Sequence, residues 1–166
     1  MPLILSGTDG VSGNSGAIVS DTAKSATGTS VDFTGIPSWV KRVTVMLSNV
    51  SLSGTTSWSV QIGSGSFTTS GYASGTTRAS TGTTSTSTSG FVIQPLTADS
   101  SYNGHIILTL VGSNTWVSSH AIFASTGNSA VVGGGGVTLS GSLDRVRAIA
   151  GGADTFDAGT INILYE

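Results

Sequence analysis

The chain has 166 residues, of which 53 are Ser or Thr and 24 are Gly, and only 8% are charged, against about 25% in an ordinary soluble domain. A formal net charge of -2 with 6 Lys and Arg residues excludes a basic footprint for nucleic acid, and no apolar run is long enough to span a membrane. The absence of Cys excludes disulfides, thiolate metal sites and a thiol nucleophile within the chain.

The first part of the chain, residues 1–28, is rich in Gly, Ser, Thr and Asp. We expect it to form a short N-terminal arm that docks on a partner or a symmetry mate, because terminal residues are poorly ordered unless they are tied down. Two short apolar stretches in this arm, Met1–Leu5 and Ala17–Val19, are candidate strands.

Alternating apolar residues begin after the arm, in a single domain expected over residues 29–166. Arg42–Ser48 and Trp58–Ile62 each place every second apolar side chain on one face, which predicts half-buried strands with Trp58 inside. The following tract, Gly63–Gly90, turns almost wholly to Ser, Thr and Gly, and we expect an exposed edge or a long loop there.

The clearest hairpin signal lies near the middle of the domain. Ile106–Val111 and Thr115–Phe123 flank the turn-forming group Gly112–Asn114, and the alternation in the second arm predicts a buried Trp116. We expect a flexible break at Gly133–Gly136. A phosphate-binding loop is rejected there, because the Lys, the Ser or Thr at the needed spacing and the following helix are all missing.

Short strands separated by turns continue to the end of the sequence, and no segment has a sustained helical period. The pattern predicts an all-β fold, an antiparallel, jelly-roll-like β-sandwich. Further strands are expected at Val31–Ile36, Phe91–Ile93, Val137–Leu139, Leu143–Ile149 and Ile161–Tyr165.

Two long blocks resemble a recurrent domain of tailed-bacteriophage and prophage proteins, namely tail fibres and virion structural proteins. The blocks are residues 29–45, TSVDFTGIPSWVKRVTV, and residues 141–147 with 154–166, GSLDRVR and DTFDAGTINILYE. The resemblance covers roughly residues 25–166 and implies a homotrimer, a place on the virion after assembly in the host cytoplasm, and no catalytic residues or cofactor. It leaves open a tail fibre or fibre tip, and a capsid decoration or head fibre.

The two histidines, His105 and His120, lie in the two arms of the hairpin and are near-opposite by count. A two-His metal site is conceivable on that count. No acid lies in the hairpin arms to complete such a site, so the sequence favours structural or surface roles and we predict no metal.

Three acids, Asp144, Asp154 and Asp157, sit near Arg145 and Arg147 towards the end of the chain. A carboxylate pair among them would suit a small polysaccharide depolymerase. Acids and arginines across a Gly turn more often join neighbouring strands by ion pairs, so we predict a structural role and no enzyme activity.

A surface for contact with a host is expected where loops carry aromatic or basic side chains. Tyr72, Arg78 and Tyr102 are the candidates, within the tracts Gly63–Gly90 and Ala98–Gly104. The expected partners are copies of the same chain, other virion proteins through residues 1–28, and a host cell-surface glycan, with no nucleic acid and no membrane insertion.

Overall fold

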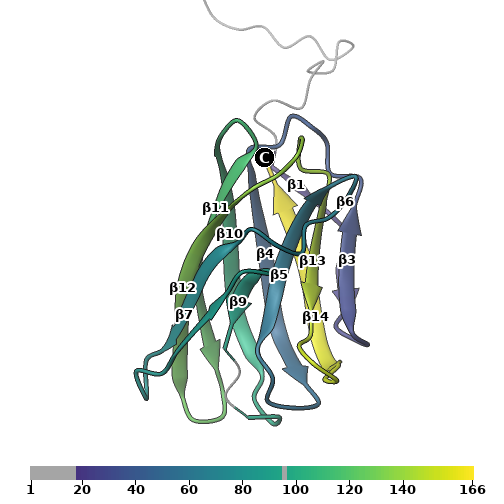
Figure 1. Cartoon of the computed structure of the whole chain (residues 1–166). Helices are drawn as coiled ribbons and strands as arrows, with labels where there is room; N and C mark the ends of the chain where they lie inside the picture. Colours follow the sequence, from purple (N-terminus) through teal and green to yellow (C-terminus); the bar gives the residue numbers. More distant parts are fainter. Residues whose placement is uncertain (1–17, 95–96) are drawn as a thin grey trace, which may run out of the picture.

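The computed structural model describes residues 18–94 and 97–166, which form two antiparallel β-sheets packed face to face (Figure 1). The described residues contain no helix, and so none that could cross a membrane. The chain passes between the two sheets several times, as it does in jelly rolls. The expected all-β antiparallel sandwich is confirmed.

The larger sheet has nine strands and the smaller has five. The order in the larger sheet is β1-β14-β4-β10-β11-β12-β7-β8, with β2 also paired to β14, and the order in the smaller is β3-β13-β5-β6, with β9 also paired to β5. The strands are β1 Val19–Ser20, β2 Lys24–Ser25, β3 Ser30–Thr34, β4 Arg42–Leu52, β5 Trp58–Ser64, β6 Ser66–Phe67, β7 Ala73–Arg78, β8 Thr84–Ser87, β9 Phe91–Ile93, β10 Tyr102–Gly112, β11 Thr115–Ala124, β12 Ser129–Thr138, β13 Arg145–Ile149 and β14 Phe156–Tyr165.

The core lies between the sheets and is filled by every second side chain of the long strands, as the alternation predicted. Trp58 is fully buried, with its ring edge-on to Phe156 at 5.7 Å and to Tyr102 at 6.3 Å between centroids. Trp116 is 1% exposed, so both tryptophans lie where the sequence placed them.

The predicted hairpin is β10 and β11, joined by the two residues Ser113 and Asn114. Both have positive φ, 47° and 62°, as a type I′ turn requires, and such a turn matches the twist of the strands it joins. On β11, Trp116, Ser118, His120 and Ile122 face the core and the alternate residues face outward.

The expected flexible break at Gly133–Gly136 is wrong, because these glycines lie inside β12 and pair with β11 on one side and β7 on the other. A Cβ on Gly134 would lie 2.6 Å from the carbonyl oxygen of Ser118 on β11, so the neighbouring backbones leave no room for a side chain. Close approach of three strands, and not flexibility, accounts for Gly133, Gly134 and Gly135.

The expected arm boundary at residue 28 is also wrong for residues 18–28. β1 and β2 pair with β14, Gly28 forms a bridge with Phe156, and Ala26 is fully buried in the core. This segment therefore completes the edge of the larger sheet, while the rest of the proposed arm and the candidate strand Met1–Leu5 lie outside the described residues.

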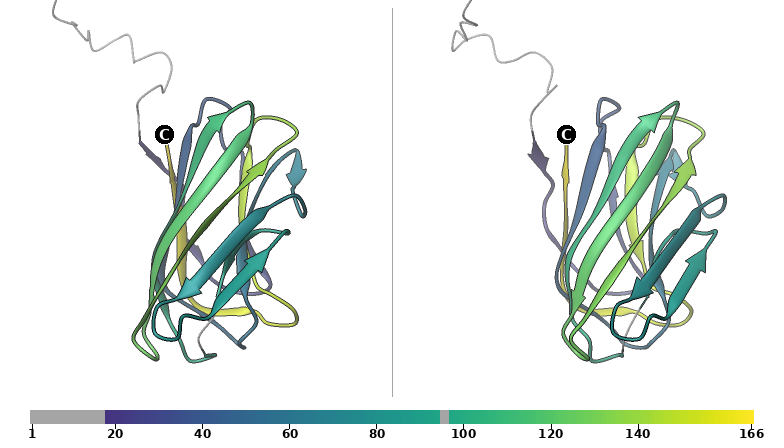
Figure 2. Two further views of the ribbon diagram at one scale, coloured as in Figure 1. Left: turned by 60° about the vertical axis from the view of Figure 1, so that its left-hand side comes forward. Right: turned by 90° about the vertical axis from the view of Figure 1, so that its left-hand side faces the viewer.

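The hydroxyl-rich tract 63–90 contains β6, β7 and β8, and the last two strands extend the larger sheet beyond the edge of the smaller one (Figure 2). Their Ser and Thr side chains suit an edge position, because Thr has a high strand propensity and hydroxyls can form hydrogen bonds with water. Ser74 Oγ on β7 accepts a hydrogen bond from the backbone N–H of Val92 at 2.9 Å, so the hairpin also protects the free edge of β9.

Candidate functional site

The structure corrects the prediction that Tyr72 and Tyr102 form a contact surface, because they are 2% and 1% exposed. The ring of Tyr72 packs edge-on against Phe91 at 5.0 Å, and its hydroxyl oxygen accepts a hydrogen bond from Ile62 N–H at 2.9 Å and donates to the Ile62 carbonyl at 3.2 Å. Burial raises the pKa of Tyr72 to about 12, so its hydroxyl stays protonated inside the fold.

Arg78, the third predicted contact residue, is half-buried at the last position of β7. Its backbone N–H donates to the carbonyl of Thr83, and its carbonyl accepts from Gly82 N–H, which closes the turn between β7 and β8. The predicted contact loop at 98–104 ends early, because β10 begins at Tyr102.

The two histidines do not form a metal site, because they lie on opposite faces of one sheet. His105 is exposed and pairs with Ala121, whereas His120 is 6% exposed and pairs with Ile106. Burial lowers the pKa of His120 to about 4, and its Nε2 lies 3.0 Å from the hydroxyl of Thr76. Among the described residues no group of three or more His, Cys, Asp or Glu is placed to hold a metal ion.

The three candidate acids of a depolymerase are each engaged with a different neighbour. Asp144 lies before the five-residue β13, and Asp154 lies beyond its end, where its carboxylate accepts from the backbone N–H of Thr56 at 2.7 Å. Asp157, on β14, accepts a hydrogen bond from the hydroxyl of Ser51. These contacts position loops and strands.

The prediction that ion pairs near the end of the chain join neighbouring strands is met only by Arg147, and its partner is Asp32, which is not one of the three predicted acids. Arg147 on β13 makes a two-pronged contact with Asp32 on β3, at 2.9 and 2.7 Å, and lies 3.9 Å above the ring of Phe67. The hydrogen bond from Arg147 lowers the pKa of Asp32. Arg145 pairs with Asp144, its neighbour in sequence, at 2.7 Å and lowers its pKa through the same kind of contact.

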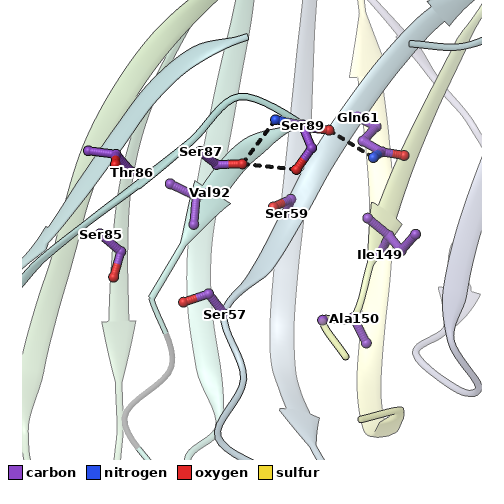
Figure 3. Close-up of a pocket in the computed structure, with 11 residues that line it drawn as sticks. Ser57, Ser59, Gln61, Ser85, Thr86, Ser87, Ser89, Val92, Ile149 and Ala150 are labelled. Atoms are coloured by element: carbon purple, nitrogen blue, oxygen red, sulfur yellow. Dashed lines mark hydrogen bonds between the residues drawn. The ribbon is translucent and has the colours of Figure 1, made fainter. Parts of the chain in front are cut away.

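A groove of about 480 Å³ opens on the outer side of the smaller sheet, where β8 and the segment after it face β5 (Figure 3). Its floor is a row of paired residues, Val92 on β9, Ser59 on β5 and Ile149 on β13. At one end Gln61 Nε2 donates to the Ser89 carbonyl at 2.8 Å. The lining is completed by Ser57, Ser85, Thr86, Ser87, Ala150 and Gly151, so it contains no charged side chain.

A second surface is the outward face of the larger sheet, which we call the broad face (Figure 2). Three of its side chains, Val117, Phe123 and Val132, are large and apolar and 41%, 49% and 43% exposed. Its central positions contain no Asp, Glu, Lys or Arg. They are Thr44, Met46, Ala73, Gly75, Thr77, His105, Ile107, Thr109, Val117, Ser119, Ala121, Phe123, Ala130, Val132, Gly134 and Gly136.

The broad face was not predicted from the sequence. The groove was predicted in part, because Ser85, Thr86, Ser87 and Ser89 lie in the tract Gly63–Gly90 where a contact surface was expected. Alternation identified the individual outward residues of β11, but the broad face depends on the register of five strands. The groove depends on β8 facing β5, a contact between segments far apart in the chain. A scan against protein-family models, a search of curated proteins and a search of solved structures each gave no match.

Proposed function

We propose that the chain is a bacteriophage virion structural protein, a tail-fibre or fibre-tip component that contacts the host surface and has no enzyme activity. The observation that carries the proposal is the broad face, a sheet surface with exposed apolar side chains and no formal charge at its centre. Monomeric proteins rarely leave such a patch uncovered, so the face supports assembly. The two sequence blocks that resemble phage fibre domains supply the kind of assembly.

The occupant that suits the broad face is a second copy of the same chain. Copies packed around a symmetry axis with their broad faces inward oppose no like charges there, since the central positions hold no formal charge. Five strands about 4.8 Å apart, paired over about seven residues of about 3.4 Å each, cover of the order of 600 Å². A standard interface buries about 800 Å² on each partner. The number of copies, three, is taken from the fibre resemblance.

Self-association is tested by placing a charge on the broad face. Val132→Lys should shift the chain towards monomer in analytical ultracentrifugation, because lysines from facing copies would be buried together. The control is Thr55→Lys, at an exposed position between β4 and β5 and outside the broad face. An unchanged mass for Val132→Lys, or a wild-type chain that is already monomeric, would refute the proposed interface.

The role on the particle is tested by binding of the purified protein. A fibre component should bind host cells, and weak contacts should gain strength from several copies. Binding to expanded heads but not to host cells would instead identify a capsid decoration protein. Turnover of host capsule or lipopolysaccharide that is lost in a folded Asp157→Asn variant would identify a depolymerase and overturn the proposal.

A further inference from the structure

We propose that the groove between β8 and β5 is a binding site for an uncharged saccharide. The assignment rests on the proposed host-contact function, and it names the chemistry of the ligand and the residues that hold it. The volume of about 480 Å³ falls within the range of about 300–1,000 Å³ that is usual for small-molecule sites.

The groove offers hydroxyls that are not used by the protein. Ser57, Ser59 and Ser85 are half-buried, and within residues 18–94 and 97–166 their hydroxyls have no hydrogen-bond partner. Figure 3 shows Ser59 on β5 and Ser57 just before that strand, with Ser85 of β8 across the groove from them. Each hydroxyl both donates and accepts, which matches the hydroxyls of a sugar ring.

The floor of the groove supplies the apolar contact that a sugar also needs. Val92 and Ile149 flank Ser59 in one row across three strands. Val92 is only 3% exposed, so the half-buried Ile149 provides most of the aliphatic surface beside the hydroxyl. The C–H groups on one side of a pyranose ring fit such aliphatic surface, while its hydroxyls reach the walls. The strands hold these positions rigidly, which reduces the entropy lost on binding.

The charges near the groove exclude an acidic ligand. None of the lining residues is Lys, Arg or His, and Arg147, the neighbour of Gln61 on β13, is paired with Asp32. A sialic or uronic acid would lose the hydration of its carboxylate without gaining a cation. The groove therefore favours neutral hexoses and hexosamines over acidic sugars.

The test measures binding of the full chain to neutral oligosaccharides of glucose, galactose, mannose and N-acetylglucosamine, beside matched oligosaccharides that carry sialic or uronic acid. The wild type should bind at least one neutral member, and bind its acidic counterpart at least tenfold more weakly. Ser59→Phe should abolish binding, because its ring would cover the floor between Val92 and Ile149.

Ser85→Ala should weaken binding about two- to tenfold, as expected for one lost hydrogen bond, and keeps the test informative if Ser59→Phe does not fold. The matched control is Ser119→Ala, an exposed serine on the broad face, which should bind as the wild type does. The groove is ruled out if no neutral oligosaccharide binds at millimolar concentration, if both groove variants bind normally, or if acidic sugars bind equally well.

These results separate the groove from the virion role. If antibodies to the protein label virions and block adsorption but no sugar binds, the groove assignment fails and the proposed function stands. If sugar binds through the groove but the protein is absent from virions, the groove stands and the proposed function fails.

Discussion

Replacing Tyr72 by Phe removes a single oxygen atom from the core and should lower the free energy of unfolding by about 2 kcal/mol. The carbonyl of Ile62 keeps the backbone N–H of Thr68 as a donor at 3.0 Å, so it stays satisfied in the variant. The N–H of Ile62 donates to the Tyr72 hydroxyl at 2.9 Å and would be left buried and unpaired. This unpaired donor accounts for most of the expected loss.

The assay is thermal and urea unfolding of Tyr72→Phe at pH 7. For a chain of this length a loss of about 2 kcal/mol corresponds to a fall of about 4–8 °C in Tm. The control is Tyr165→Phe, because Tyr165 is half-buried against Trp39 and its hydroxyl has no hydrogen bond within the described part of the chain. A Tm for Tyr72→Phe within 1 °C or so of wild type would refute the buried placement and revive the surface role.

The dependence of stability on alkaline pH is a second test of the buried position of Tyr72. Below pH 10 Tyr72 is neutral in both states, so its ionisation has no effect on stability. Between pH 10 and about 12 only the unfolded chain ionises, and stability should fall by about 1.4 kcal/mol per pH unit. Tyr72→Phe should remove that component, and an unchanged alkaline profile would argue against a raised pKa.

Three further predictions concern charge and packing. Because the pKa of His120 falls from 6.5 to about 4 on folding, stability should drop as the pH is lowered from 6.5 to 4, and urea titrations of His120→Leu should lack that component. Gly134→Ala should destabilise the fold by about 1–3 kcal/mol, because its Cβ would meet a backbone oxygen at 2.6 Å. Gly136→Ala, whose Cβ would meet its nearest atom at 3.6 Å, should be close to neutral in the same melts. Asp32→Asn should lower the free energy of unfolding by about 1 kcal/mol near pH 7. Because Arg147 lowers the pKa of Asp32, the difference between wild type and variant should vanish as the pH falls below 3.8. If the stability of the two proteins changes equally with pH in this range, the ion pair is contradicted.

Local patterns were sufficient to predict the long strands and the β10–β11 hairpin. Alternation along β4, β5 and β11 is a property of each strand, and the turn at Ser113–Asn114 is set by its own residues. The class of fold follows from such local signals, since no helical pattern competes with them.

The errors arise where distant segments decide the structure. The glycine run in β12 looks like a linker in sequence, but the backbones of two neighbouring strands, β11 and β7, approach it closely. Tyr72 stands among polar residues in the sequence, yet its ring lies in the core. β9 pairs only with residues 58–60 of β5, so the backbone N–H of Ile62 has no partner on β9 and donates to the Tyr72 hydroxyl instead. The register partner of His105 is Ala121, one position away from His120. Since successive side chains of a strand point to opposite faces, the two histidines lie on opposite faces of the sheet.

Candidate acids were easier to interpret from the sequence than candidate surfaces, because a surface depends on which distant segments lie side by side. Asp144, Asp154 and Asp157 beside two arginines made structural ion pairs the favoured expectation for this region. The partner that Arg147 takes, Asp32, follows only from the register of β3 and β13. The groove and the broad face consist of hydroxyls, glycines and aliphatic side chains, which carry no chemical signature when taken one at a time.

The most direct test of the proposed function is a cryo-electron microscopy map of the intact virion at a resolution that separates strands. We expect density for this sandwich in a tail fibre or fibre tip, in copies whose broad faces pack around a shared symmetry axis and whose grooves face outward. Density for the sandwich on the capsid would contradict the tail assignment. Absence of the protein from purified virions would contradict the virion role altogether.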